Sequence, residues 1–160
     1  MPTPYTEVLV FACNWDGWSC IETAANSGDC YPASVKVVKV SCLSRIHSGL
    51  ILKAFEFGAD GVMLIGCEPG RCHFGIDSEH IINEYEKART VLEMLGMRKD
   101  RLALLQLPAF SGRAFVMRVA SFIAEVERLS ASKRARVIGH RPAQDITVPS
   151  HSSLAIEKGR

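Results

Sequence analysis

Three apolar segments of this chain are typical of β-strands, and each ends in a cysteine or runs directly into one. A fourth cysteine follows the third segment in the loop GCEPGRCH, whose two cysteines are separated by four residues. The carboxyl ends of parallel strands lie along one edge of a sheet, where α/β proteins bind ligands. We therefore expect the four thiols to converge there and to form a metal or redox site. They belong to Cys13, Cys42, Cys67 and Cys72.

The segments around these cysteines alternate between strand and helix four times, which predicts an α/β fold with a flavodoxin-like, doubly wound parallel sheet. Lys36 and Lys39 suit an edge strand, so with right-handed crossovers the expected strand order is 2-1-3-4. The predicted strands are residues 7–12, 35–40, 62–65 and 102–107. The predicted helices run from about residue 20 to 25, from Ser44 or Ser48 through Phe55, from Asp77 or Ser78 through Leu95, and from Ser111 through Leu129.

Length and composition predict one globular domain, which we place at residues 1–130. Residues 131–160 carry six Lys and Arg against two Asp and Glu and include Pro142 and Pro149, so we predict a basic, extended or disordered tail that is solvated rather than bound to nucleic acid. No apolar segment approaches the ~18 residues of a membrane-spanning helix, and the first residues lack the pattern of a signal peptide. We expect a cytoplasmic protein.

The cysteine spacing favours an iron-sulfur cluster over zinc. Structural zinc sites commonly use paired C-x2-C motifs, which this sequence lacks, whereas thiolates from separate loops with one C-x4-C pair are compatible with an iron-sulfur cluster. A disulfide scaffold does not suit a chain of this size without an export signal. No C-x-x-C opens a helix, and Gly66-x-x-x-Gly70 matches neither common nucleotide-binding glycine motif. A structural zinc-binding interaction module is the alternative.

The other two cysteines are expected to have lesser roles. Cys20 lies one helical turn beyond Asp16, where it is either a spare ligand or, as we prefer, a packed helix residue. Cys30 precedes a surface turn, and we assign it no role.

Aromatic and basic residues flank the predicted site, and each has two interpretations. Trp15 and Trp18 either have a role at the site, in which they shield a cluster from water or present an apolar face to a partner, or pack in the core. Arg45 and Arg71 either offset the negative charge of a cluster or are solvated. Four thiols already satisfy the ligand count, so we expect His73 to be at most a hydrogen-bond donor beside the ligands.

Four motifs in this order resemble one family: FACNW (11–15), VSCLSR (40–45), AFEFGADG (54–61) and GCEPGRCH (66–73). Over about residues 8–126 the chain resembles the delta (iron-sulfur) subunit of the methyl-viologen-reducing, coenzyme F420-non-reducing hydrogenase. The resemblance implies a 2Fe-2S cluster held by Cys13, Cys42, Cys67 and Cys72. It also implies a relay of electrons between a hydrogenase or formate-dehydrogenase module and the flavin-containing A-type subunit of a heterodisulfide reductase, within an electron-bifurcating hetero-oligomeric complex.

The chain departs from this family pattern at one position. The family commonly has a further cysteine three residues after the first, where this chain has Asp16. Either that cysteine is dispensable, which is the simpler interpretation, or Asp16 or Cys20 takes part in an altered cluster.

Overall fold

The computed structural model describes residues 6–138, with side chains described for residues 6–130. Strands and helices alternate along this part of the chain, with short 3-10 turns at Leu43–Arg45 and Lys99–Arg101. The elements are β1 (Val8–Cys13), α1 (Asp16–Asn26), β2 (Val35–Val40), α2 (Ser48–Glu56), β3 (Gly61–Gly66), α3 (Glu79–Met94), β4 (Leu102–Gln106) and α4 (Gly112–Ile138).

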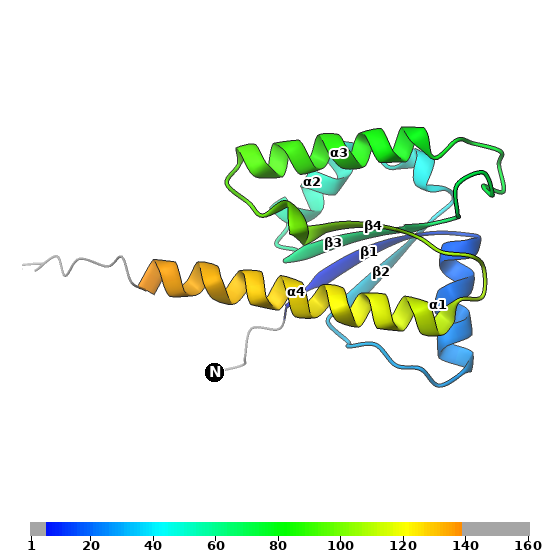
Figure 1. The fold of residues 1–160 in the computed structure, drawn as a ribbon, viewed down its shortest axis with the longest axis horizontal. Helices are drawn as coiled ribbons and strands as arrows, with labels where there is room; N and C mark the ends of the chain where they lie inside the picture. Colours follow the sequence, from blue (N-terminus) through cyan, green and yellow to red (C-terminus); the bar gives the residue numbers. More distant parts are fainter. Residues whose placement is uncertain (1–5, 139–160) are drawn as a thin grey trace, which may run out of the picture.

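The four strands form one parallel sheet in the order β2-β1-β3-β4, so the predicted α/β fold and strand order are confirmed. β2 is the edge strand that its two lysines predict, and both lysines are exposed. β3 lies between β1 and β4 and is buried along its whole length. All strands point the same way, toward the end of the molecule at which the loops lead into α1 and α3 (Figure 1).

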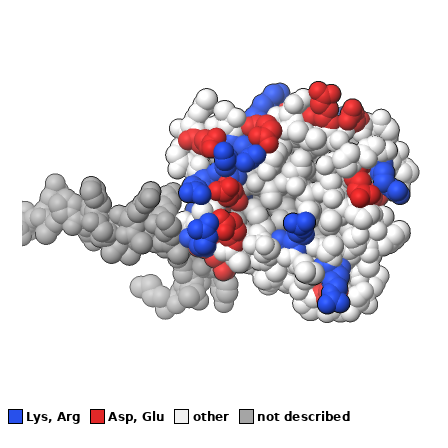
Figure 2. All heavy atoms as spheres, viewed as in Figure 1, with Lys and Arg blue, Asp and Glu red and all other residues white. Residues whose placement is uncertain are grey.

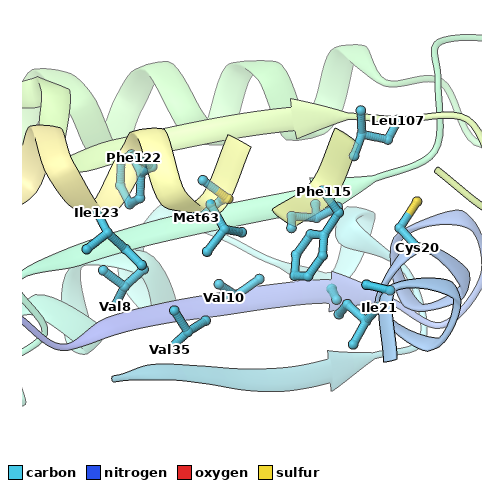
Figure 3. Close-up of a cluster of buried hydrophobic side chains, with 14 of the residues drawn as sticks. Val8, Val10, Cys20, Ile21, Val35, Met63, Leu107, Phe115, Phe122 and Ile123 are labelled. Carbon is cyan, nitrogen blue, oxygen red and sulfur yellow. The ribbon is translucent and has the colours of Figure 1, made fainter. Parts of the chain in front are cut away.

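Helices cover both faces of the sheet, α1 and α4 on one face and α2 and α3 on the other (Figure 1). Because side chains alternate along a strand, β1 contributes to two cores. Val8 and Val10 pack with Phe115 of α4 on the first face (Figure 3). Phe11 and Cys13 pack on the second face, against residues of α2 and α3. The sheet is thus held from both sides, which fixes the positions of its strand ends.

Two helix starts differ from the prediction in their details, and the start of α3 agrees with it. α1 begins at Asp16, four residues before the predicted start. α2 is capped by neither predicted serine: the Nδ1 atom of His47 accepts the N–H of Leu50 at 3.2 Å. At α3, Ser78 is the capping residue by position, but the carboxylate of Asp77 accepts the N–H of Glu79 at 3.1 Å.

α4 extends to Ile138, so residues 131–138, which begin the segment predicted as an extended or disordered tail, are helical. The reason is local: residues 131–138 include Ala, Lys and Arg, which favour helix, and contain no glycine or proline. The remainder of the predicted tail, residues 139–160, lies outside the described residues. Despite the length of α4, none of the helices within residues 6–138 is apolar enough over a sufficient length to cross a membrane.

Acidic and basic side chains are interspersed on the face shown in Figure 2. Several form local ion pairs, such as Arg98 with Asp100 and Arg128 with Glu125. These pairs lie at the surface, where each contributes little to stability.

Candidate metal centre

The four predicted thiols lie together at the carboxyl edge of the sheet. Cys13 is the last residue of β1, and Cys67 directly follows β3. Cys42 lies two residues beyond β2, and Cys72 lies in the loop between β3 and α3. All four side chains line one small pocket, whose wall also includes Leu43, Gly66 and Ile81. Residues from three strand ends, far apart in sequence, thus share one site.

Within this pocket the sulfur atoms form two close pairs. The Sγ atoms of Cys13 and Cys67 are 3.7 Å apart, and those of Cys42 and Cys72 are 3.8 Å apart. Two thiolates on one tetrahedral metal, each at about 2.3 Å from it, have sulfurs about 3.8 Å apart. Each pair therefore has the spacing of two ligands on one metal ion. All four cysteines are free thiols in the structure.

The four sulfurs do not form a single cage. Among the described residues, no three His, Cys, Asp or Glu side chains are grouped closely enough to hold one metal ion together. A structural zinc ion in a thiolate site needs four ligands around one centre. The donor set of four thiolates fits a two-iron cluster, because such a cluster takes four cysteines. Its division into two pairs suits two metals better than one.

The start of α1 packs directly on the Cys13–Cys67 pair. The N–H of Gly17 donates to the Sγ atom of Cys13 at 3.2 Å, and the backbone N–H of Asp16 acts to lower the pKa of the Cys67 thiol. Gly17 permits this approach because a Cβ atom there would be 2.6 Å from the carbonyl oxygen of Ile65 and 3.3 Å from the sulfur of Cys13. The early start of α1 thus brings backbone N–H groups to two sulfurs that carry negative charge when they bind a metal.

The environments of the two pairs differ. Cys13 is 2% exposed, whereas Cys67, Cys42 and Cys72 are all half-buried, so only the first pair has a buried member. Burial raises the pKa of the Cys67 thiol to about 12, although the N–H of Asp16 acts to lower it. Burial also acts to raise the pKa of Cys72, but the N–H groups of Phe74 and Ile76 and the thiol of Cys42 outweigh it, so this pKa is lowered.

A stack of aromatic rings ties together two loops of the site. The indole of Trp15, which precedes α1, stacks on the imidazole of His73 with ring centroids 3.4 Å apart and an angle of 17° between planes. Phe74 meets both rings edge-on. Trp15 and Phe74 are 39% and 52% exposed, so the stack joins the loop before α1 to the loop after Cys72 while showing apolar surface to solvent.

The other residues considered beside the site lie away from the sulfurs or in solvent. Cys20 is fully buried in the core under α4, and its thiol donates to the carbonyl oxygen of Pro108 at 3.3 Å, which agrees with a packed helix residue. Cys30 is exposed. Trp18 packs against the same core and donates to the Glu22 carboxylate at 2.7 Å, so the two tryptophans have different roles.

Arg45 and Arg71, the two arginines predicted beside the site, are both exposed. The guanidinium of Arg71 lies 3.9 Å from the Glu68 carboxylate. Sequence reasoning missed the role of Gly17, because only the folded structure shows which backbone atom its missing side chain would meet.

Residues 8–130 match the model of the family described as methyl-viologen-reducing hydrogenase, delta subunit. The chain belongs to this family. The family resemblance read from the four sequence motifs is therefore confirmed.

Two relatives of similar length are iron-sulfur subunits by name. The iron-sulfur subunit of the vhc F420-non-reducing hydrogenase of Methanococcus voltae is 34% identical over 109 residues, covering 68% of this chain and 76% of the relative. The iron-sulfur subunit of the F420-non-reducing hydrogenase of Archaeoglobus profundus is 30% identical over 129 residues, which cover 81% of this chain and 94% of the relative.

A third relative is much longer. The A-type subunit of ferredoxin:CoB-CoM heterodisulfide reductase of Methanosarcina mazei is 28% identical over 122 residues, which are 76% of this chain but 15% of that protein. The corresponding protein of Methanosarcina acetivorans is matched over 17% of its length. This chain therefore corresponds to a small part of each of these longer proteins.

Proposed function

We propose that the protein is an electron-transfer subunit in which Cys13, Cys42, Cys67 and Cys72 hold a 2Fe-2S cluster. The observation that carries this proposal is the arrangement of the thiols as two pairs with sulfur separations of 3.7 and 3.8 Å in one pocket. When bound, such a cluster supplies one-electron storage without proton chemistry of its own. Membership of the hydrogenase delta-subunit family and the iron-sulfur names of two relatives support the same assignment.

The surrounding residues would tune the cluster rather than react with substrate. N–H groups of Asp16 and Gly17 on the inner side, and of Phe74 and Ile76 on the outer side, favour negative charge on the sulfurs. Such hydrogen bonds raise a reduction potential, because the reduced cluster carries one more negative charge. Leu43 and Ile81 provide apolar walls that limit the access of water. The chain would thereby set the position and potential of the electron carrier.

We propose the A-type subunit of a heterodisulfide reductase as one electron partner and a hydrogenase module as the other. Support comes from the two long heterodisulfide reductase relatives, in which the region similar to this chain is joined covalently to a much longer polypeptide. We propose that this chain contacts an A-type subunit of this kind. Four exposed apolar side chains near the carboxyl edge of the sheet suit such a contact: Trp15, Phe74, Ile76 and Phe110. A formate-dehydrogenase module and a cytoplasmic location stay predictions from the sequence.

Metal and acid-labile sulfide analysis of protein purified without oxygen tests the cluster. We expect equal amounts of iron and sulfide, together with visible absorption. Cys67→Ala, which supplies no ligand atom, should remove that absorption and leave the far-UV circular dichroism largely intact, whereas the control Cys30→Ser should retain it. Zinc without sulfide would instead establish the alternative, a structural zinc-binding module. Equal loss of absorption in Cys30→Ser would contradict the ligand assignment.

A further inference from the structure

We propose that the four thiols act as two fixed pairs, with Cys13 and Cys67 holding an inner iron and Cys42 and Cys72 holding an outer iron. The identity of the metal rests on the proposed function. The pairing itself rests only on where the sulfurs lie. It makes the two halves of the cluster unequal in burial and in their protein contacts.

The pairing runs against the order of the sequence. Cys67 and Cys72 are neighbours in one loop, and their C-x4-C spacing alone would make them a pair. The loop turns between them: the N–H of Arg71 donates to the carbonyl of Glu68 at 3.0 Å, and Gly70 has a φ of 74°. After this turn Cys72 lies beside Cys42, while Cys67 stays beside Cys13 at the ends of two paired strands.

The two pairs are anchored differently. Cys13 and Cys67 flank the hydrogen-bonded strands β1 and β3 and receive the N-terminus of α1, so their positions are set by the core. Cys42 and Cys72 lie further along their loops and are both half-buried, whereas the first pair has one buried member, Cys13, and one half-buried member, Cys67, directly after β3. His73, which follows Cys72, stacks its imidazole on the indole of Trp15. An electron arriving from a partner at this surface would therefore meet the outer pair first.

Double cysteine variants of the iron-loaded full chain test the assignment by Mössbauer spectroscopy in the oxidised state. In Cys42→Ser/Cys72→Ser both serine oxygens would lie on one iron, so one quadrupole doublet should shift strongly and the other should keep its wild-type parameters. In the matched variant Cys67→Ser/Cys72→Ser each iron would gain one oxygen, and both doublets should shift. The pairing would be overturned if both doublets shifted in Cys42→Ser/Cys72→Ser while only one doublet shifted in Cys67→Ser/Cys72→Ser.

Disulfide mapping tests the pairing without the metal. Four thiols allow three ways of pairing. Iron-free full-length protein is treated under native conditions with diamide, which takes two electrons and two protons from each pair of thiols and becomes the hydrazine as the S–S bond forms. Peptide mass spectrometry should find mainly Cys13–Cys67 and Cys42–Cys72. A predominance of Cys67–Cys72, or of Cys42–Cys67, would overturn the proposal. The expected disulfides in a protein that binds zinc without sulfide would refute the proposed function and leave the pairing intact.

Discussion

Replacing Gly17 by alanine should weaken the hydrogen bond that the start of α1 makes to the sulfur of Cys13. The added Cβ atom would lie 2.6 Å from the backbone oxygen of Ile65, at the end of a buried central strand. Opening this contact to an ordinary 3.4 Å requires a movement of about 0.8 Å, and β3 is held between two strands, so α1 should be the part that moves. The N–H of Gly17 would then move away from the sulfur of Cys13, to which it donates at 3.2 Å.

Two opposing effects set the stability of Gly17→Ala. Overpacking costs about 1–3 kcal/mol, and alanine is better than glycine in a helix by about 1 kcal/mol. The net expectation is a loss of about 0–2 kcal/mol in the free energy of unfolding.

The weakened hydrogen bond acts on the reduction potential. A hydrogen bond to a charged group contributes about 1.5–3 kcal/mol, and losing about 1 kcal/mol of preference for the reduced form lowers a one-electron potential by about 40 mV. A spectroelectrochemical titration of the anaerobic protein measures this shift, and urea unfolding measures stability.

Gly49→Ala in α2 is the matched control for Gly17→Ala. The nearest atoms to its new Cβ belong to the side chain of His47, which can move, rather than to a buried backbone. It should leave the potential unchanged, and its stability should change little, because the gain from alanine in the helix is offset by displacement of the His47 ring that caps α2. A Gly17→Ala protein with an unchanged potential and higher stability than wild type would refute the argument that the close approach of α1 tunes the site.

Three further outcomes are expected. Hydrogen bonds from Lys87 and from the N–H of Ser48 hold the pKa of Glu84 down at about 2. The contribution of this carboxylate to the free energy of unfolding is therefore fully present above its ordinary pKa of 4.5 and is lost as the pH falls toward 2. The stability difference between wild type and Glu84→Gln in urea should thus shrink across this range, and a pH-independent difference would contradict it. Trp15→Leu loses the stack on His73, about 0.5–1.5 kcal/mol, and should speed the removal of iron by a chelator, whereas Phe57→Leu at an 80%-exposed position should not. Phe115→Ala, at a fully buried position, should cost about 3–5 kcal/mol in thermal or urea unfolding; a loss below 1 kcal/mol would show that α4 is not held by this contact.

The convergence of the thiols could be predicted because it depends on two robust features of the sequence. Apolar strands that end in cysteine are easily recognised, and parallel strands put their carboxyl ends on one edge whatever the details of packing. The lysines of β2 then located the edge strand, which gave the strand order that the structure has.

The pairing of the sulfurs and the role of Gly17 could not be predicted in the same way. The first depends on a turn within the Cys67–Cys72 loop, and the second on the distance between α1 and the end of β3. Both are tertiary distances that leave no periodic signal in the sequence. His47 is a related case, since histidine ranks low among helix-capping residues and serines stand close by on both sides.

The division of the site between strands and loops explains why metal loss should leave the fold in place. Cys13 is the only one of the four that belongs to a strand of the described structure, and the cores on both faces of the sheet are built from aliphatic and aromatic side chains. Removing a metal would therefore free the loops that carry Cys42 and Cys72 while β1 and β3 stay paired. The same division has a consequence for electron transfer. Cys13 is buried, and its pair with Cys67 is fixed by the ends of two central strands, whereas Cys42 and Cys72 are both half-buried in loops. Under the proposed function, the strand-anchored pair would keep the geometry of the site constant while the loop pair would be the half that a partner protein reaches.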